Sequence, residues 1–355
     1  LAAWRLLAER LGTAPREEAE RHGLEVAMDI ALQASPDHPW VQTNPEFFTT
    51  RADGTIAYAE NPPKKYQDIY PIDFNADMPG IEKEVERIMN LWIEAGVTIF
   101  RIDNPHTKPV RFWQDVIAAV TKKHPEILFL AEAFTRPGMM RALSYVGFTQ
   151  SHCYFPWRNT KEELGKYLET TNGDDGYYQH NTFWPTTPDI LTAYVRDNGV
   201  AGHCVRAVLA AMGSPSWGIY NGYELIENKQ RPGFEEQIDN EKYEYKPRDW
   251  SAPEAQGLTR LLTQLNRIRA AHPALRQLRN LTVHSTSNST CMWRKPNGIR
   301  GTRRLPARSR RTGCCPSRWR PPALASSDRF SSWRSSRSAA EAPLCHLRST
   351  LRSAL

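Results

Sequence analysis

Three carboxylates in this chain of 355 residues each lie in or just after a short apolar run. Asp103 ends the run in FRIDNPHTKP, Glu132 lies in LFLAEAF, and Asp189 follows FWPTTP. Glycoside chemistry requires such acids in pairs, because one attacks or stabilises the anomeric carbon while the other protonates the leaving oxygen. A third carboxylate can hold sugar hydroxyls and help to distort the ring. Together the three residues predict a site that breaks or transfers a glycosidic bond.

Arg101 stands two residues before Asp103, and side chains two apart in a strand point to the same side. A guanidinium in that position would keep the Asp103 carboxylate ionised, as a nucleophile requires. The alternative is that Asp103 caps the N-terminus of the next helix, with which the following Pro105 is compatible.

Glu132 and Asp189 have structural alternatives of the same kind. A lone Glu in an almost continuous apolar strand is costly unless it is paired or used. Apolar surroundings raise the pKa of a carboxyl group, which suits a general acid near neutral pH. The alternative for Glu132 is an ion pair across the barrel. Asp189 follows Pro188, a context that also fits a helix cap.

The elements that must position these residues alternate between β-branched runs and helical stretches, which is typical of βα units around a parallel sheet. Strands are predicted at 24–32, 96–104, 127–134, 148–155, 180–184 and 215–225. Helices are predicted at 2–22, 81–95, 110–123, 161–170, 190–197, 205–212 and 258–275. The predicted fold class is α/β, an incomplete (β/α)8 TIM barrel.

A closed barrel of this type needs eight strands, so the first two are expected upstream of this chain. The chain opens with Leu1 inside a predicted helix, which also suggests a fragment. Because an incomplete barrel leaves two sheet edges open, we expect the isolated chain to fold poorly or aggregate.

Between residues 40 and 77 the helical period disappears, and the stretch is rich in Pro, Asn, Asp and Tyr. A loop of this length in a compact domain is usually functional. Aromatic side chains here and later in the chain have the chemistry to stack on sugar faces, although each alone is as well explained by packing: Trp40, Tyr66, Trp157, Trp184 and Tyr220.

The net charge of +7 is distributed unevenly along the chain. The 56 residues from Arg300 onward contain 13 Arg and 2 acidic residues, a balance of +11, so the rest of the chain carries −4. This tail also lacks Val, Ile, Tyr, Lys, Asn, Gln and Met. We interpret it as a gene read out of frame and as disordered, in preference to a natural basic arm or a nucleic-acid-binding module.

Three of the six cysteines lie in this tail, and Cys153, Cys204 and Cys291 are scattered through the rest of the chain. They show neither metal-ligand spacing nor a disulfide framework, which fits a reducing cytoplasm. No run approaches the roughly 18 apolar residues of a membrane-spanning helix, and no signal peptide is visible. Neither a membrane nor a nucleic acid is therefore an expected partner.

Four motifs resemble the conserved regions of the α-amylase superfamily, glycoside hydrolase family 13: DIALQASPDHPW, FRIDNPHTKP, LAEAF and TTPDIL. Longer segments resemble its maltosyltransferase branch, the GlgE-type α-1,4-glucan:maltose-1-phosphate maltosyltransferases: NPPKKYQDIYPIDF, RIDNPHTKPVRFW, GIYNGYEL and NEKYEYKPRDW. The resemblance covers about residues 1–295. It implies an α-amylase-type barrel at 1–257 with an inserted loop subdomain at about 40–77. A linker helix and the start of a C-terminal β-domain follow at 258–299, before the tail at 300–355.

The resemblance implies a retaining transfer of maltosyl from α-maltose 1-phosphate to the non-reducing end of an α-1,4-glucan, such as glycogen or a maltooligosaccharide, with release of phosphate. It implies that Asp103 is the nucleophile and that Glu132 is the general acid and then the general base. Asp189 would stabilise the transition state, and Arg101 would support Asp103. No metal or organic cofactor is implied, and members of this branch are typically homodimers.

The same resemblance implies a set of donor-binding residues. The donor phosphate is expected to meet Asn61, Lys64, Tyr66 and Asn104, and the donor pocket is expected to include Gln33, Asp68, Lys242 and Tyr243. A phosphate leaving group needs hydrogen-bond donors and a cation, and NPPKKY supplies an amide, an ammonium and a phenol. Lys65 is an alternative to Lys64, and a solvated basic turn is the alternative for the whole stretch.

One position departs from the branch, which usually has Asn-Thr before Pro-Asp. Thr186 and Thr187 stand there instead, which removes one amide expected near Asp189. Two other functions remain open. One is a different superfamily enzyme, either an α-glucan hydrolase or a sucrose-phosphorylase-like enzyme. The other is an inactive truncated product that at most binds glucan.

Overall fold

The computed structural model describes residues 15–61, 64–239, 246–284 and 293–296. These residues form two compact units, one ending at Tyr154 but including Tyr177–Thr182, and the other made of Phe155–Gly176 and the chain from Phe183 onward. The predicted tail from residue 300, most of the predicted helix at 2–22, and the site residues Lys242 and Tyr243 lie outside the described residues. Within the described ranges, no helix is both long and apolar enough to cross a lipid bilayer.

Parallel strands form the centre of the first unit. In sheet order they are β1 (Ala27–Ile30), β6 (Ile99–Ile102), β7 (Leu128–Ala131), β8 (Gln150–His152) and β9 (Asn181–Phe183), each parallel to the next. Side chains alternate across this sheet. On β6, Phe100 and Ile102 are fully buried, while Arg101 between them lies on the opposite face. One face of the sheet is therefore apolar, and the other is free to carry polar groups.

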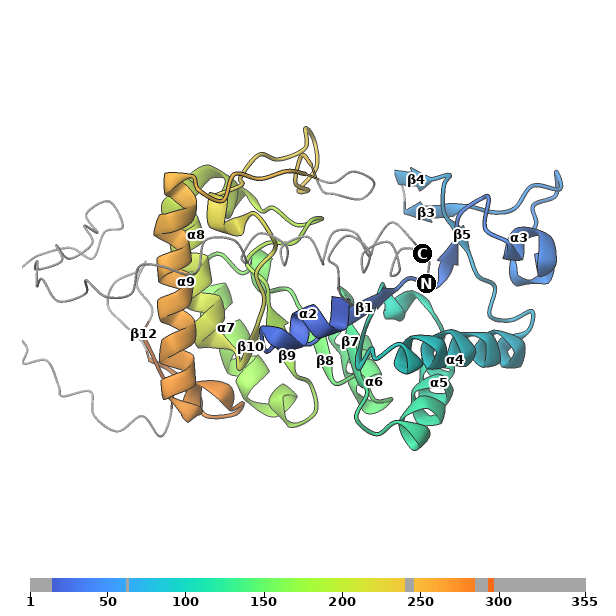
Figure 1. Cartoon of the computed structure of the whole chain (residues 1–355), viewed down its shortest axis with the longest axis horizontal. Helices are drawn as coiled ribbons and strands as arrows, with labels where there is room; N and C mark the ends of the chain where they lie inside the picture. The colour runs from blue at the N-terminus through green and yellow to red at the C-terminus, as the bar shows by residue number, and fades with distance from the viewer. Residues whose placement is uncertain (1–14, 62–63, 240–245, 285–292, 297–355) are drawn as a thin grey trace, which may run out of the picture. The chain divides into compact units, whose positions relative to one another are not determined.

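Two amphipathic helices share a core with the apolar face of this sheet. α4 (Met78–Glu94) packs against α5 (Val110–Lys123), and the two are drawn in teal in Figure 1. Buried residues on α4 recur every three or four positions, as at Ile81, Val85 and Met89, which is the spacing of a single helix face. Two shorter helices belong to the same unit, α2 (Pro15–Arg21) and α6 (Pro137–Tyr145).

Residues 33–77 form a run of short elements rather than a long helix. Strand β2 (Gln33–Ala34) pairs antiparallel with β5 (Tyr70–Pro71). Between them lie α3 (Trp40–Thr43), the 3-10 turn η1 (Pro45–Phe47) and a hairpin of β3 (Ala59–Asn61) and β4 (Lys64–Tyr66), labelled in Figure 1.

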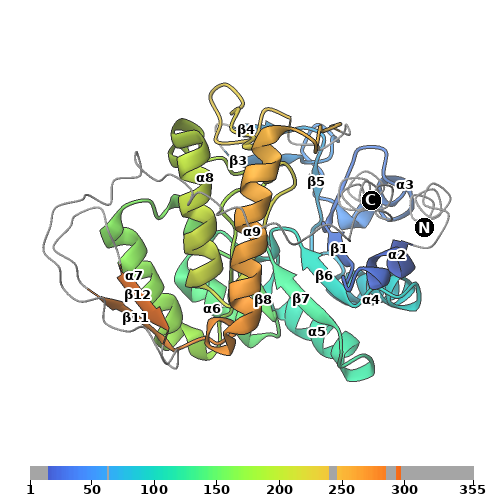
Figure 2. The same ribbon diagram turned by 60° about the vertical axis from the view of Figure 1, so that its left-hand side comes forward.

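The second unit is mostly helical. α8 (Ala193–Gly213) and α9 (Pro253–Ala271) lie side by side in Figure 2 and bury Ala207 and Leu262 in one cluster. Within this unit β10 (Ser216–Trp217) precedes Gly218, whose N–H donates to the Phe183 carbonyl at 3.1 Å. The remaining elements are α7 (Lys161–Asn172), η3 (Phe155–Trp157), η4 (Asp174–Tyr177), η5 (Tyr223–Leu225), η6 (Pro273–Arg276) and the antiparallel pair β11 (Leu281–His284) and β12 (Trp293–Pro296).

The structure confirms an α/β fold, and each of the six predicted strands contains an observed one. The two helices predicted at 190–197 and 205–212 correspond to the two parts of α8, which are separated by a kink at Gly199, where φ is 47°. Only glycine adopts such a backbone without strain, which explains why the sequence reads as two helices. α6 was not predicted, because its opening Pro137 and Gly138 resemble a loop.

Candidate active site

The parallel register brings four charged residues of the first unit onto one face. Asp29 on β1 lies directly opposite Arg101 on β6. One residue beyond the strand ends, the Asp103 N–H donates to the Ile30 carbonyl at 2.9 Å, and the Glu132 N–H donates to the Ile102 carbonyl at 3.0 Å. These bonds continue the ladder past the last strand residues. Asp103 and Glu132 therefore stand next to each other at the carboxyl ends of β6 and β7.

One guanidinium, that of Arg101, joins all three carboxylates. Its Nη1 donates to both oxygens of Asp29, at 2.8 and 2.9 Å, and to Oδ1 of Asp103 at 2.9 Å. Its Nη2 forms an ion pair with Oε2 of Glu132. The Arg101 side chain is only 13% exposed, so these charges interact in a site largely shielded from water. The predicted same-side arrangement of Arg101 and Asp103 is present.

Neither Asp103 nor Glu132 has a purely structural role in this cluster. Asp103 does not cap a helix, because the turn η2 (Pro105–Thr107) has Asn104 at its N-cap and α5 has Pro109. The ion pair considered for Glu132 is present, but its partner is the same arginine that binds Asp103. The surroundings of Glu132 are therefore charged as well as apolar, which differs from the prediction.

The charges around Asp103 favour its ionised form. Burial alone would raise the pKa of this carboxyl group, but the Arg101 guanidinium, a hydrogen bond with the Glu132 carboxyl and the Lys108 ammonium lower it by more. The pKa of Asp103 therefore lies below its ordinary value.

The turn after β6 is held from several directions. Asn104 has a left-handed backbone with φ of 44°, and its Nδ2 lies 3.4 Å from Oδ2 of Asp103. The Thr107 hydroxyl donates to the Asn104 carbonyl at 2.8 Å. From α5, the buried Trp113 donates its Nε1–H to the Pro105 carbonyl at 2.9 Å. Hydrogen bonds within the turn and from α5 thus hold the segment that carries Asp103 in one conformation.

Two residues of this site were not singled out by sequence reasoning. Asp29 was seen only as the end of a strand, and its partnership with Arg101 depends on a strand register that spans 72 positions of the chain. Lys108 is buried, and its Nζ donates to the carbonyls of Asp103 and Asn104 at 3.3 and 3.2 Å. A lysine five residues after a candidate nucleophile, in the segment NPHTKP, was the available signal.

The predicted donor-binding residues of the first unit lie in or beside the short elements of residues 33–77. The hairpin register pairs Asn61 with Lys64, Glu60 with Lys65 and Ala59 with Tyr66. Since alternate positions of a strand share a face, positions 64 and 66 fall on one face of β4 and position 65 on the other. Gln33 begins β2, and Asp68 lies in the turn after β4.

Asp189 belongs to the second unit. It sits with Pro188 at the tip of a tight turn closed by two backbone hydrogen bonds between Thr187 and Ile190, at 3.0 and 3.2 Å. A neighbouring segment supports the turn, because the Gln237 N–H donates to the Pro188 carbonyl at 3.1 Å. Helix α8 has Thr192 at its N-cap, so Asp189 does not cap that helix.

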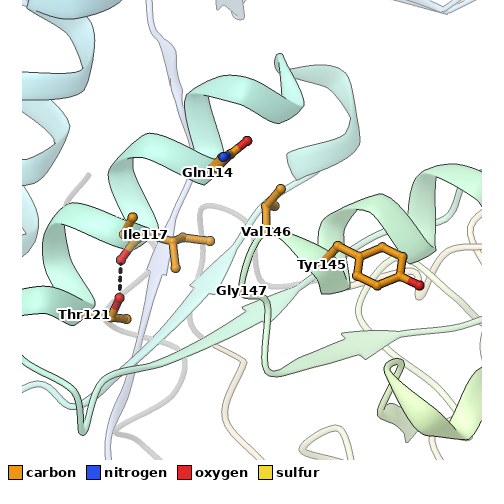
Figure 3. A pocket seen from close by; sticks show the side chains of 7 residues that line it. Gln114, Ile117, Thr121, Tyr145, Val146 and Gly147 are labelled. Atoms are coloured by element: carbon orange, nitrogen blue, oxygen red, sulfur yellow. Dashed lines mark hydrogen bonds between the residues drawn. The ribbon is translucent and has the colours of Figure 1, made fainter.

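A surface hollow of about 510 Å³ lies elsewhere on the first unit, between α5 and α6 (Figure 3). Tyr145 is the only ionisable side chain among the residues that line it, and Thr121 on α5 uses its hydroxyl to bond the Ile117 carbonyl at 2.7 Å. This hollow therefore lacks the carboxylate pair that glycoside chemistry needs. Within the described part of the chain, no group of three His, Cys, Asp or Glu side chains is arranged to hold a metal ion.

Comparison with known proteins identifies relatives that share one name. The chain is 78% identical over 297 residues to the alpha-1,4-glucan:maltose-1-phosphate maltosyltransferase of Bifidobacterium longum, which covers 84% of this chain and 39% of that protein. It is 73% identical over 272 residues to the enzyme of the same name from Bifidobacterium animalis subsp. lactis, covering 77% of this chain and 37% of that protein. The chain thus spans about two fifths of the length of these curated relatives. The predicted resemblance to the maltosyltransferases is confirmed.

Solved structures with the same fold include α-amylases. The α-amylase from H. orenii superposes with a TM-score of 0.60 at 14% identity, covering 79% of this chain and 70% of that one. The α-amylase from Geobacillus thermoleovorans gives a TM-score of 0.59 at 14% identity, covering 79% and 63%. At this identity the likeness establishes the fold alone, and it confirms the predicted α-amylase-type architecture. No protein-family model matches the chain.

Proposed function

We propose that this chain carries the catalytic centre of a retaining maltosyltransferase. The enzyme would move a maltosyl group from α-maltose 1-phosphate to the non-reducing end of an α-1,4-glucan and release inorganic phosphate. The observation that carries the proposal is the binding of Asp103 and Glu132 by a single guanidinium, that of Arg101. The shared name of the relatives supports the choice of donor and acceptor.

In the first step, the Asp103 carboxylate attacks the anomeric carbon of the donor. The bond from that carbon to the phosphate oxygen breaks, and Glu132 gives its proton to the departing phosphate. The lowered pKa of Asp103 keeps it ionised for the attack. Glu132 is the carboxyl group proposed to carry the proton that the leaving group needs.

In the second step, the 4-hydroxyl at the non-reducing end of the glucan attacks the maltosyl ester of Asp103. Glu132, now ionised, takes the hydroxyl proton, and the Asp103 carboxylate is released. Two displacements at one carbon retain its configuration. A retaining pair of carboxyl groups is separated by about 5–5.5 Å, whereas an inverting pair is farther apart to admit water. Bonding of both carboxyls to adjacent nitrogens of Arg101 supports the closer, retaining arrangement.

The other predicted residues complete the proposal. Asp189 would stabilise the positive charge that develops on the sugar ring. Asn61, Lys64, Tyr66 and Asn104 would bind the donor phosphate, and Gln33, Asp68, Lys242 and Tyr243 would shape the donor pocket. The alternation of positions along β4 supports Lys64 rather than Lys65, because position 64 shares a face with Tyr66. We further propose that the protein works in the cytoplasm and pairs as a homodimer when complete.

The test measures phosphate release from α-maltose 1-phosphate by the full chain, with and without glycogen. Glycogen-dependent release that disappears in Asp103→Ala, while the circular dichroism spectrum is unchanged, supports the transferase. A folded chain that releases no phosphate, or releases it equally without glycogen, contradicts it.

The alternative is an α-glucan hydrolase, which the α-amylase fold and the same carboxylate pair would also serve. The replacements Lys64→Ala and Tyr66→Phe distinguish the two functions. They should lower the rate of a phosphate-dependent transferase severalfold or more and leave a hydrolase almost unchanged. Shortening of maltooligosaccharides without any phosphate requirement would favour the hydrolase.

A further inference from the structure

Lys108 is a buried cation to which the two steps described above assign no role of its own. Its side chain is almost enclosed, and its Nζ donates to two backbone carbonyls, those of Asp103 at 3.3 Å and Asn104 at 3.2 Å. The first carbonyl belongs to the residue proposed as the nucleophile, and the second belongs to the residue that follows it. The ammonium group therefore lies immediately behind the reacting carboxylate.

A charge in this position is energetically expensive if its only task is to hold a turn. Burial penalises the charged form and lowers the pKa of Lys108, while the carboxylates of Asp103 and Glu132 act in the opposite direction. Two carbonyl acceptors can be satisfied by a neutral amide, which costs less to bury than an ammonium. The turn is also held independently by the Trp113 indole and the Thr107 hydroxyl.

Among the described residues, the charges that act on Lys108 are those of Arg101 on β6, Asp103 after β6 and Glu132 after β7, and His106 in η2 is also near it. Asp29 on β1 joins this cluster through its bonds with Arg101. His106 is kept neutral, because burial and the nearby Lys108 lower its pKa more than Asp103 raises it. The remaining groups are three carboxyls and two cations, so the cluster is neutral only when one carboxyl carries no charge.

We infer that Lys108 is a positioning residue that keeps this cluster electrically balanced in both resting states of the two-step reaction. The inference rests on the proposed function. Before the first step, Glu132 holds a proton, and the charges of Asp29 and Asp103 are balanced by Arg101 and Lys108. After it, Asp103 is a neutral ester and Glu132 is ionised, so the balance is the same. The proton leaves with the phosphate, and no net charge is left in the buried site.

Without the Lys108 charge, both states would carry one uncompensated negative charge. Removal of a cation raises the pKa of nearby carboxyl groups. Asp103 must be ionised to react, so the acid limb of the kcat/KM profile would move to higher pH. Glu132 must be protonated, so the alkaline limb would move in the same direction.

The test compares Lys108→Met, which keeps the length of the side chain but not its charge, with Lys108→Arg and Lys108→Gln. Lys122→Met is the matched control, because Lys122 is an exposed residue of α5 outside the cluster. In Lys108→Met, both limbs of the pH profile should shift upward by about one pH unit, the lower end of the usual effect of a neighbouring charge. Lys108→Arg should restore the limbs toward their original positions, and Lys122→Met should leave them unchanged. Should Lys108→Met fail to fold, Lys108→Gln retains a donor and should show the same shift.

A fall in kcat with both limbs unmoved in the neutral variants would overturn the inference, because it would reduce Lys108 to a support for the turn. A second measurement does not depend on turnover. The carboxyl carbon of Glu132, followed by NMR in a chain labelled with 13C-glutamate and assigned with Glu132→Gln, should titrate at higher pH in Lys108→Met. A shift of this signal in a chain that releases no phosphate would uphold the electrostatic role and contradict the proposed function. If the signal does not move in a chain that releases phosphate, the electrostatic role of Lys108 is contradicted and the proposed function is upheld.

Discussion

Asp29 and Arg101 lie opposite each other in the parallel register of β1 and β6, and both oxygens of the Asp29 carboxylate accept from the same guanidinium nitrogen, at 2.8 and 2.9 Å. These two bonds fix the orientation of the Arg101 guanidinium relative to Asp103 and Glu132. The carboxylate that takes no part in the proposed chemistry therefore orients the guanidinium that binds the other two.

The replacement Asp29→Asn tests this relationship. It retains the shape of the side chain but removes the charge that orients Arg101. We expect kcat/KM for maltosyl transfer to fall by a factor on the order of 10², the effect of a displacement of about 1 Å in a catalytic group. The measurement is initial phosphate release in the presence of glycogen. Asp53→Asn in an exposed loop is the control, and wild-type activity in Asp29→Asn would contradict the role.

The lowered pKa of Asp103 makes a prediction about stability. A group whose pKa is lower in the folded state stabilises the fold above its unfolded pKa of about 3.9. That contribution is lost as the pH falls through the lower, folded value. Between pH 5 and strongly acidic solution, the wild type should therefore lose more unfolding free energy than Asp103→Asn. Urea unfolding of both chains across this range measures the difference, and parallel curves would contradict it.

The Trp113 indole should stabilise the turn that follows Asp103. In Trp113→Phe the Pro105 carbonyl loses the indole donor and keeps the Lys108 N–H at 3.2 Å, so the loss is that of one hydrogen bond, about 0.5–1.5 kcal/mol of unfolding free energy. Trp217→Phe is a matched control, since its Nε1–H bonds Asn266 at 3.2 Å from a partly exposed position and should matter less. Urea unfolding measures both. Equal losses in the two variants would argue against a specific role for Trp113.

Neighbouring lysines on β4 should behave differently. Position 64 shares a face with Tyr66, whereas Lys65 pairs in the register with Glu60 on the other face. We expect Lys64→Ala to raise the KM for α-maltose 1-phosphate by about tenfold, the effect of losing roughly 1.4 kcal/mol of a charge-assisted contact. Lys65→Ala, the matched control, should change it little. Steady-state kinetics at varied donor concentration measure the KM of both variants. A larger increase in KM for Lys65→Ala than for Lys64→Ala would assign the phosphate contact to Lys65 instead.

The sequence was sufficient to locate the strands and the pair Arg101 and Asp103, because alternation and apolar runs are local properties of the chain. It was not sufficient to find Asp29 as a partner of Arg101, since that contact depends on how two distant strands align. Lys108 was missed for a different reason. A lysine in a polar turn usually points to solvent, and only the packing of α5 against the turn makes it a buried charge.

The left-handed backbone of Asn104 restricts which mutations this position can accept. Glycine adopts a φ of 44° freely and asparagine tolerates it, but other side chains pay a steric cost. The proposed phosphate contact, in contrast, needs the amide and excludes glycine. A substitution at position 104 must therefore meet two independent requirements. Folding requires a residue that tolerates the left-handed backbone, and turnover requires the side-chain amide. A library of all substitutions at position 104, sorted first for soluble expression and then for activity, should retain glycine in the first sort and lose it in the second.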